Sequence, residues 1–330
     1  MTSVVVGAGA WGTALADLIA RGGQPAVLWA REEDVVADVN SHHLNTRFLN
    51  GVTLSPALTA TTDLADAVFA AETITFVAPS HVLRAVVRSA AHAVRRDAVL
   101  IVATKGIERE SFALMTDIVA EELPGRAVVA LSGPSFAAEV AMRQPTAVVA
   151  ASRDVEAALR AQQLFSSREF RVYTQRDVTG VELGGALKNV MAVATGVLDG
   201  LGLGFNPRAA LITRGLAEMT RLGVALGAEA RTFAGLAGMG DLVLTCTGSL
   251  SRNRTVGVEI GQGRPIEDVL HARETVAEGV ITTQSAHALA LSRGVEMPIV
   301  SAMHRILFEA MPPRDAIAEL MARALRAESD

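Results

Sequence analysis

The chain has 330 residues, of which 50% are apolar and 20% are charged, with a formal net charge of −5. This length is sufficient for two domains that each bury a core of their own. The acidic balance, the lack of a basic run and an aromatic content of 4% argue against a nucleic acid as the main partner. A single cysteine, Cys246, excludes an internal disulfide and a metal site built from cysteines.

The N-terminal residues and the distribution of charge bear on localisation. The sequence runs directly into an apolar segment at residues 4–6, with no basic region before it, so we expect no secretory signal. Charged residues interrupt the apolar runs before these reach membrane-spanning length. We therefore expect a soluble, cytoplasmic protein without an integral membrane segment.

The first predicted unit is a strand, a glycine-rich turn and a helix. Residues 3–6 form a β-branched apolar run, Gly7-Ala-Gly-Ala-Trp-Gly12 follows at once, and residues 13–20 show helical periodicity. This order is that of the dinucleotide fingerprint G-x-G-x-x-G. Gly7 permits the tight turn, Gly9 lets the main chain approach a pyrophosphate, and Gly12 allows helix and strand to pack closely. The helix N-terminus then faces the phosphate charge.

The end of the second predicted strand, residues 26–29, bears on which dinucleotide is preferred. A site specific for NAD places an acidic residue there for the ribose 2′-hydroxyl, whereas this chain has Ala30 and Arg31, followed by Glu32 and Glu33. Arg31 is suited to pair with a 2′-phosphate, so NADP is the preferred cofactor and NAD the alternative. Arg31 is otherwise interpreted as a solvated residue at a helix start.

Strands and helices continue to alternate through the first half of the chain. Further strands are predicted at residues 73–77, 99–102, 128–131, 146–150 and 171–173. Helices are predicted between them, including residues 82–94 and 155–165. Such alternation predicts an α/β fold with a mostly parallel, doubly wound sheet of the Rossmann type.

Three polar segments directly follow apolar runs in this half. In a doubly wound sheet the ligand lies beyond the carboxyl ends of the strands, so these segments should meet around one crevice. They are Pro79-Ser80-His81, Thr104-Lys105-Gly106 and Gly133-Pro134-Ser135. His81 is interpreted either as a general acid or, more commonly for a lone histidine at a helix start, as a cap or packing residue.

Beyond residue 176 the strand pattern disappears and helical periodicity replaces it. Helices are predicted at residues 177–198, 208–226, 255–261, 266–270, 282–293, 297–310 and 314–327. Asp177 is the expected N-cap of the first of these helices. We therefore expect residues 1–176 to form a dinucleotide-binding domain and residues 177–330 to form an all-helical substrate and catalytic domain.

Two lysines stand out among the basic residues. Of the 30 lysines and arginines, only Lys105 and Lys188 are lysines. Lysine can release its proton and arginine cannot, so Lys188, inside an apolar helix, is interpreted as a group that exchanges a proton with substrate. The alternative is a core lysine whose ammonium group reaches solvent. Gly184 lies one turn before Lys188, and a glycine inside a helix indicates that something approaches closely there.

Two polar segments of the second half are candidates for the same site. Asp241 lies in a glycine-rich, apolar stretch, where it either caps the following helix or orients Lys188. The run 248–254 ends in a helix start, where Ser251 is a suitable N-cap and Arg252 and the free backbone N–H groups form an anion cradle. The alternative for this run is a solvated surface turn.

Together these segments resemble the bacterial NAD(P)-dependent glycerol-3-phosphate dehydrogenases over essentially the full chain. The resemblance is carried by Gly7-Ala-Gly-Ala-Trp-Gly12, Thr104-Lys-Gly106, Gly133-Pro-Ser-Phe-Ala137, Glu182-Leu-Gly-Gly-Ala-Leu-Lys-Asn189, Gly238-Met-Gly-Asp241, Ser251-Arg-Asn253 and Val276-Ala-Glu-Gly279. It implies reduction of dihydroxyacetone phosphate to sn-glycerol 3-phosphate, the precursor of glycerophospholipids, by NADPH or NADH. It also implies a cytoplasmic enzyme without a metal, for which we expect a homodimer.

The resemblance further implies roles for individual residues. Those expected to contact the dinucleotide, besides the three fingerprint glycines, are Ala10, Trp11, Arg31, Lys105, Ala137, Arg252, Val276 and Glu278. Those expected to line the substrate are Lys105, Gly133, Ser135, Lys188, Asp241, Thr245, Ser251, Arg252 and Asn253. Ala10 stands where many members of the family have serine or threonine, which removes one hydroxyl contact to the pyrophosphate.

The predicted mechanism assigns catalytic roles to Lys188, Lys105 and Asp241. Lys188 protonates the substrate oxygen as hydride reaches the carbonyl carbon, and Lys105 supplies a second positive charge. Arg252 holds the substrate phosphate and so orients the reacting carbon. Two neighbouring, partly desolvated ammonium groups should lower the pKa of Lys188, whereas Asp241 should raise it.

Two other functions fit part of this pattern. A related two-domain dehydrogenase of a hydroxy acid or a sugar acid also places a Lys-Asn pair on the first helix of its second domain. The phosphate cradle and the Thr-Lys-Gly loop distinguish this chain from it. A non-catalytic NADPH sensor would bind the cofactor alone and would have no use for the two lysines.

Overall fold

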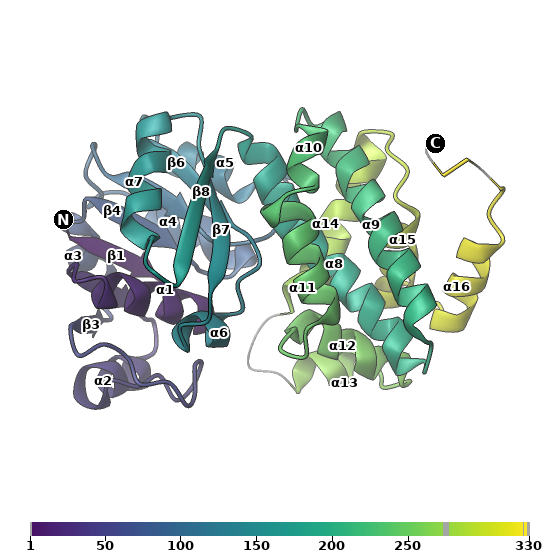
Figure 1. Ribbon diagram of the computed structural model, residues 1–330, viewed down its shortest axis with the longest axis horizontal. Helices are drawn as coiled ribbons and strands as arrows, with labels where there is room; N and C mark the ends of the chain where they lie inside the picture. Colours follow the sequence, from purple (N-terminus) through teal and green to yellow (C-terminus); the bar gives the residue numbers. More distant parts are fainter. Residues whose placement is uncertain (1, 273–276, 326, 329–330) are drawn as a thin grey trace.

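The computed structural model of the protein describes residues 2–272, 277–325 and 327–328. Figure 1 shows two parts side by side: a part built around a sheet, coloured purple to teal, and an all-helical part, coloured teal to yellow. We call residues 2–175 the sheet half and the described residues from Val178 onward the helical half.

The sheet has eight strands in the order β3-β2-β1-β4-β5-β6-β7-β8. They are β1 (Ser3–Val6), β2 (Ala26–Trp29), β3 (Leu58–Thr61), β4 (Thr73–Phe76), β5 (Val99–Val102), β6 (Val128–Ser132), β7 (Thr146–Ala151) and β8 (Phe170–Gln175). Neighbouring strands are parallel except β6 and β7, which are antiparallel. The predicted mostly parallel, doubly wound sheet is therefore confirmed, and its strand order reverses between β1 and β4.

One strand, β3, was not predicted from the sequence. It pairs only with β2, at the edge of the sheet. Of its four residues only Leu58 and Ala60 are buried, so it lacks the continuous apolar run that marks the central strands. The other seven strands lie where the sequence placed them, with small differences at their ends.

Helices cover both faces of the sheet. They are α1 (Ala10–Arg21), α2 (Glu33–His42), α3 (Leu64–Phe69), η1 (Ser80–Val82), α4 (Leu83–Ala90), α5 (Met115–Glu122), α6 (Ala137–Ala141) and α7 (Val155–Phe165). Successive strand residues point to opposite faces: Val5 belongs to one buried apolar cluster and Val4 to the other. The helix predicted at residues 82–94 is shorter in the structure, where α4 ends at Ala90.

The helical half is organised around its longest helix, α8. Its elements are α8 (Val178–Gly200), α9 (Phe205–Ala225), α10 (Ala230–Phe233), η2 (Leu236–Gly240), α11 (Asp241–Thr247), α12 (Arg252–Gly261), α13 (Ile266–His271), α14 (Glu278–Ser292), α15 (Pro298–Phe308) and α16 (Pro313–Met321). Helices α9, α11, α12, α14 and α15 all pack against α8 (Figure 1). Every residue from Gly180 to Leu198 is buried as a result.

Helix α8 begins as predicted, because the Asp177 side chain accepts a hydrogen bond from the Gly180 N–H at 2.9 Å. By length and composition α8 could cross a membrane, even though Glu182 and Lys188 interrupt its apolar residues. The apolar stretch of α8 is nevertheless completely buried inside the protein, as in a core helix.

Three segments of the helical half differ most from the sequence-based expectation. Helix α10 was not predicted. The glycine-rich stretch around Asp241, expected as a loop, forms the π-helical turn η2 and the start of α11. The last helix was expected to continue to residue 327 but ends at Met321. The next residues, 322–325, are exposed, and without packing a short segment gains too little from helix propensity to remain helical.

The two halves share apolar surface at two places. Ala130 and Val149 of the sheet pack with Val181 of α8. In the loop between β5 and α5, Ile107 and Leu114 pair with each other in an isolated β-bridge and are part of the apolar core of the helical half. That loop also carries Lys105, so part of the candidate site is attached to both halves.

Candidate active site

Both lysines of the chain bind the same carboxylate. Lys188 Nζ donates to Asp241 Oδ1 at 2.6 Å and Lys105 Nζ donates to Asp241 Oδ2 at 2.6 Å. Lys105 comes from the loop after β5, Lys188 from the middle of α8 and Asp241 from the first residue of α11. The side chain of Asp241 is 1% exposed. We call these three residues the lysine cluster; it joins the two halves of the molecule.

Burial and charge within the lysine cluster set the proton affinity of Lys188. Burial lowers the pKa of Lys188 to about 8; the nearby charge of Lys105 also lowers it, and the carboxylate of Asp241 opposes the change. Burial would raise the pKa of Asp241, but the two ammonium groups hold it below its usual value. Lys188 therefore does not reach out to solvent, which excludes the alternative interpretation, and its pKa is lowered as predicted.

Thr245 completes the surroundings of the Lys188 ammonium group. Its hydroxyl accepts a hydrogen bond from Lys188 Nζ at 2.9 Å and donates to the Asp241 backbone carbonyl, one turn earlier in α11, at 2.6 Å. Asp241 is not the N-cap of α11, a position that Gly240 takes. Of the two roles considered for Asp241, the geometry matches the orientation of Lys188.

Lys105 has a second contact on the sheet side. Its Nζ donates to the Gly133 carbonyl at 3.3 Å, and the Ser135 hydroxyl donates to the same oxygen at 2.9 Å. Gly133 has φ +142°, and a Cβ there would lie 2.9 Å from the Val148 Cα, so only glycine fits this turn. The segment after β6 thus meets the segment after β5, as the predicted crevice requires.

The close approach predicted at Gly184 is confirmed, and the structure identifies the approaching group. A Cβ on Gly184 would lie 2.5 Å from the carbonyl oxygen of Ala237, so the close approach is by the main chain of η2. Because η2 leads directly into α11, this approach brings Asp241 down onto α8 next to Lys188. The glycine inside α8 therefore serves the assembly of the lysine cluster.

The predicted anion cradle lies at the start of α12. The Ser251 hydroxyl accepts a hydrogen bond from the Arg254 N–H at 3.3 Å, which confirms Ser251 as the N-cap. Arg252 is exposed and makes no hydrogen bond or ion pair with any residue that the structure describes. Desolvation by the surrounding protein lowers the pKa of Arg252, and the nearby carboxylate of Glu278 opposes this change.

Asn253 connects three helices of the helical half. Its Nδ2 donates to Asn189 Oδ1 at 2.9 Å, and its Oδ1 accepts from the Gly279 N–H at 2.9 Å. Asn189 follows Lys188 on α8, and Gly279 lies in the first turn of α14. Asn253 therefore fixes the start of α12 beside the lysine-bearing helix.

Four glycines allow α12 to approach α8 more closely than side chains would permit. They occur as two i, i+4 pairs, Gly196 and Gly200 on α8 and Gly257 and Gly261 on α12. A Cβ on Gly196 would lie 2.1 Å from the Arg254 carbonyl oxygen, and one on Gly257 would lie 2.0 Å from that of Val193. We call these four residues the glycine seam.

The fingerprint after β1 has the geometry expected for a dinucleotide site. Gly7 has φ +118°, and a Cβ on Gly12 would lie 1.9 Å from the Gly7 carbonyl oxygen, so both positions require glycine. Nothing lies within 4 Å of a Cβ built on Gly9, the N-cap of α1. Open space before a helix N-terminus at the strand-order reversal is the setting in which a pyrophosphate binds.

Other predicted cofactor residues lie around this turn. Ala10 is the first residue of α1, and Ala137 begins α6, which packs against α1. Trp11 packs against the core, and its Nε1 is buried without a hydrogen-bond partner in the part of the chain that the structure describes. A buried donor beside an open cradle fits a bound dinucleotide.

Arg31 lies apart from the other predicted site residues. Its guanidinium is 82% exposed and donates to Glu32 Oε1 at 2.9 Å. After β2 the chain thus carries a cation, Arg31, that is paired with an acid, Glu32. This arrangement is compatible with either NADP or NAD as the cofactor. Val276, also predicted to touch the cofactor, lies outside the described residues.

Glu278 binds across the two halves. Its carboxylate accepts hydrogen bonds from the Ser80 N–H at 3.0 Å and the Ser80 hydroxyl at 2.6 Å. Burial raises the pKa of Glu278, although both hydrogen bonds oppose the rise. A Cβ on Gly106 would lie 2.5 Å from the Ser80 Cβ, which places this contact directly beside the Lys105 loop.

Several residues with a structural part in the site carried no individual role in the sequence analysis. Ser80 lay in a predicted crevice segment without an assigned function, and Thr104, whose hydroxyl donates to the Ala78 carbonyl at 2.8 Å, ties two of these segments together. Asn189 was marked only as half of a Lys-Asn pair.

His81 is exposed beside Glu278. Within the described ranges, no three His, Cys, Asp or Glu side chains are grouped to hold a metal ion.

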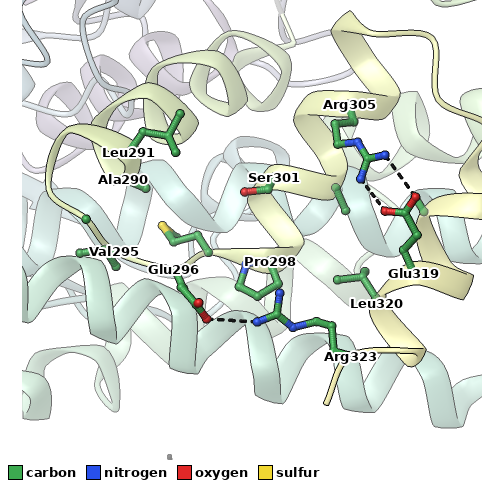
Figure 2. Close-up of a pocket in the computed structure, with 14 residues that line it drawn as sticks. Ala290, Leu291, Val295, Glu296, Pro298, Ser301, Arg305, Glu319, Leu320 and Arg323 are labelled. Atoms are coloured by element: carbon green, nitrogen blue, oxygen red, sulfur yellow. Dashed lines mark hydrogen bonds and ion pairs between the residues drawn. The ribbon is translucent and has the colours of Figure 1, made fainter. Parts of the chain in front are cut away.

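A cavity of about 430 Å³ lies elsewhere in the helical half, between α14, α15 and α16. Figure 2 shows two ion pairs among the residues that line it, Arg305 with Glu319 and Arg323 with Glu296. Neither pair, nor any other residue lining this cavity, is among the predicted site residues. The cavity is therefore separate from the lysine cluster.

A dinucleotide fingerprint after β1 and a buried lysine pair, one of whose members follows β5 of the same Rossmann-type sheet, are together typical of a nicotinamide-dependent dehydrogenase. Two family models match this chain. The model described as the N-terminus of NAD-dependent glycerol-3-phosphate dehydrogenase matches residues 3–158, and the model described as its C-terminus matches residues 177–318. The chain belongs to this family.

Known relatives are similar over their whole length. Curated glycerol-3-phosphate dehydrogenases (NAD(P)+) from Geobacter sulfurreducens and Syntrophotalea carbinolica are 54% and 53% identical, over 98% and 99% of both chains. The crystal structure of glycerol-3-phosphate dehydrogenase from Coxiella burnetii superimposes with a TM-score of 0.94, at 40% identity, over 98% of this chain and 99% of that one.

Proposed function

We propose that this protein catalyses the reduction of dihydroxyacetone phosphate to sn-glycerol 3-phosphate with NADPH or NADH, and the reverse oxidation. The observation that carries the proposal is the lysine cluster, in which Lys105 and Lys188 bind opposite oxygens of the Asp241 carboxylate. A sensor that only bound the cofactor would have no use for two ammonium groups on one buried acid.

Lys188 is the proton donor in this proposal. The fingerprint residues would hold a nicotinamide cofactor, which would supply the hydride chemistry. Lys188 Nζ donates the proton that the substrate's carbonyl oxygen takes up. A pKa lowered to about 8 makes Lys188 a stronger acid near neutral pH than an ordinary lysine. Lys105 stabilises the negative charge that develops on the oxygen, while Asp241 and Thr245 fix the ammonium group of Lys188.

The start of α12 holds the substrate phosphate. Arg252 has no partner within the described residues, and the backbone N–H groups next to Ser251 point out of a helix N-terminus. Asn253 sets the position of this helix start relative to Lys188. Gly133 and Ser135 line the opposite side of the substrate, next to Lys105.

The dinucleotide binds along the fingerprint. Gly9 leaves open space for the pyrophosphate at the N-terminus of α1. Ala10 and Ala137 flank this position. Contacts of the cofactor with Lys105, Arg252, Val276 and Glu278 remain part of the proposal, as does a 2′-phosphate contact with Arg31 that favours NADP.

In this proposal residues 1–176 form the dinucleotide-binding domain and residues 177–330 the catalytic domain. The protein acts in the cytoplasm as a homodimer and supplies glycerophospholipid synthesis. It needs neither a metal nor a membrane segment. These statements rest on the family, whose models match residues 3–158 and 177–318 and whose member from Geobacter sulfurreducens aligns over 98% of both chains.

Initial rates test the proposal directly. Loss of absorbance at the nicotinamide band is followed with NADPH or NADH and dihydroxyacetone phosphate, with dihydroxyacetone and a keto acid as the non-phosphorylated controls. The expected result is turnover of the phosphate ester alone, faster with NADPH. Turnover of a keto acid, or no oxidation with any substrate, would contradict the assignment.

A further inference from the structure

Two buried glutamates outside the lysine cluster cap helices in the same way. The Glu182 carboxylate on α8 accepts hydrogen bonds from the Thr116 N–H at 2.9 Å and the Thr116 hydroxyl at 2.5 Å, at the start of α5. The Glu218 carboxylate on α9 accepts from the N–H groups of Ile299 and Val300, at 2.8 and 3.3 Å, at the start of α15. Burial raises the pKa of each glutamate to about 7.

The two caps differ in what they connect. Glu218 joins two helices of the same helical half. Glu182 reaches from the helical half to α5 of the sheet half and is buried there, with 8% of the residue exposed. A carboxylate at a helix N-terminus satisfies free N–H groups and interacts favourably with the helix dipole, so α5 is fastened to α8 at this point.

The loop that ends at α5 is the one that carries Lys105. One end of this loop follows β5, where the Thr104 hydroxyl binds the Ala78 carbonyl. The other end runs through Leu114, which is buried in the helical half, to Thr116 and its partner Glu182. Glu182 and Lys188 lie six residues apart on α8, a rise of about 9 Å along one rigid helix.

We propose that Glu182 is a positioning residue for the reaction: by capping α5 it fastens the Lys105 loop to the helix that carries Lys188, and so holds both ammonium groups on Asp241. The proposal rests on the function proposed above for the lysine cluster. Lys188 faces Asp241, Lys105, Thr245 and the thiol of Cys246. If Lys105 leaves Asp241, Lys188 loses a repelling charge and keeps the carboxylate, so its pKa must rise.

The two lysines of the chain make this rise measurable without substrate. Lysine labelled with ¹³C at Cε should give two side-chain signals, from Lys105 and Lys188, whose pH titrations report each ammonium group. Glu182→Met removes the acceptor while keeping a helix-forming chain of similar length. Glu218→Met is the matched control, because it breaks the corresponding cap inside the helical half. Glu182→Gln is the rescue, since its amide can accept from the Thr116 N–H and donate to the Thr116 oxygen.

Expected results separate positioning from stability. Both methionine variants should lower the melting temperature, but only Glu182→Met should raise the titration midpoint of Lys188, by at least half a unit (roughly the effect of one displaced charge). It should also lower kcat at least about tenfold, with the KM for NADPH within about twofold, because misplaced groups slow chemistry. Glu182→Gln should restore most of both properties.

A second variant covers the case in which Glu182→Met does not fold. Thr116→Val removes only the hydroxyl, and it should move the Lys188 titration in the same direction by a smaller amount. Two results would reduce Glu182 to a stability role. One is that the lysine titrations stay unchanged in both Glu182→Met and Thr116→Val. The other is that Glu182→Met and Glu218→Met lose kcat equally. If the unmodified protein fails to oxidise NADPH, the proposed function falls, whereas the titrations still decide whether Glu182 positions the lysines.

Discussion

The fingerprint and the lysine cluster are prepared for function in opposite ways. At the fingerprint, space is open beside Gly9 and the buried Nε1 of Trp11 has no partner in the described chain. In the lysine cluster the polar groups already bind one another, within 2.6 to 2.9 Å. The fingerprint is thus built to receive a large ligand, and the cluster to keep charges fixed while a reaction takes place.

Glycine serves both regions but does different work in each. Gly9 faces open space, so its missing side chain leaves room for a ligand. A Cβ added to Gly184 or to any glycine of the seam would lie only 2.0 to 2.5 Å from a main-chain carbonyl oxygen, so their missing side chains let one part of the protein reach another. The same residue type therefore marks a binding surface in one region and internal packing in the other.

The largest expected effect comes from breaking proton transfer while leaving the fingerprint intact. Lys188→Arg keeps the positive charge, but arginine cannot release its proton. We expect kcat to fall about 10³-fold, with NADPH affinity, measured by fluorescence titration, unchanged within about threefold. Near-normal turnover would remove Lys188 from the mechanism.

Lys188→Met is the control for folding. Methionine has a similar length, and it relieves the cost of burying an ammonium group whose pKa is already lowered to about 8. Asp241 keeps its contact with Lys105. We expect a melting temperature close to that of the unmodified protein and no measurable turnover.

The next effect is on stability and comes from the glycine seam. In Gly257→Ala, the added Cβ would lie 2.0 Å from the Val193 carbonyl oxygen, and helix main chains cannot yield as a side-chain end can. Overpacking of this kind costs about 2 kcal/mol or more, which exceeds the gain in helix propensity of about 1 kcal/mol. Thermal unfolding should show a loss of several degrees. An unchanged melting temperature would mean that α8 and α12 are less closely packed than described.

The sequence was most informative where function requires a special residue type. The bias toward arginine singled out Lys105 and Lys188, and the fingerprint could be read because its glycines have fixed spacing after a strand. For Gly184 the sequence predicted the close approach correctly, but only the fold shows that the approaching group is the main chain at Ala237.

Contacts between distant segments left no readable signal in the sequence. Glu182 and Thr116 are 66 residues apart, and neither stands in a pattern that indicates a cap, because the capped helix and the capping residue belong to different halves. Strand β3 was missed for a related reason, since an edge strand needs only two buried residues and its identity depends on pairing with β2. Pairing partners are a property of the whole fold.

A smaller effect is expected from filling the open space at the fingerprint. Gly9 has φ −61° and ψ 173°, which alanine adopts without strain, and nothing lies within 4 Å of the new Cβ. Gly9→Ala should therefore keep the melting temperature, unlike Gly257→Ala, but weaken NADPH binding about tenfold or more because the methyl group occupies the pyrophosphate approach. Calorimetric titration of NADPH measures this, and equal affinity in both proteins would show that the phosphates bind elsewhere.

The smallest effect concerns the choice between the two cofactors. Glu32 Oε1 binds the exposed guanidinium of Arg31 at 2.9 Å, so the acid competes with a 2′-phosphate for the same cation. Arg31→Ala should raise the KM for NADPH by about twofold to fivefold, the value of an exposed charge contact, with the KM for NADH nearly constant. Glu32→Gln should shift preference the other way, because it frees the guanidinium and removes an acid that repels the 2′-phosphate. If both variants change the two KM values in parallel, the end of β2 does not select the cofactor, and its polar residues serve only to start α2.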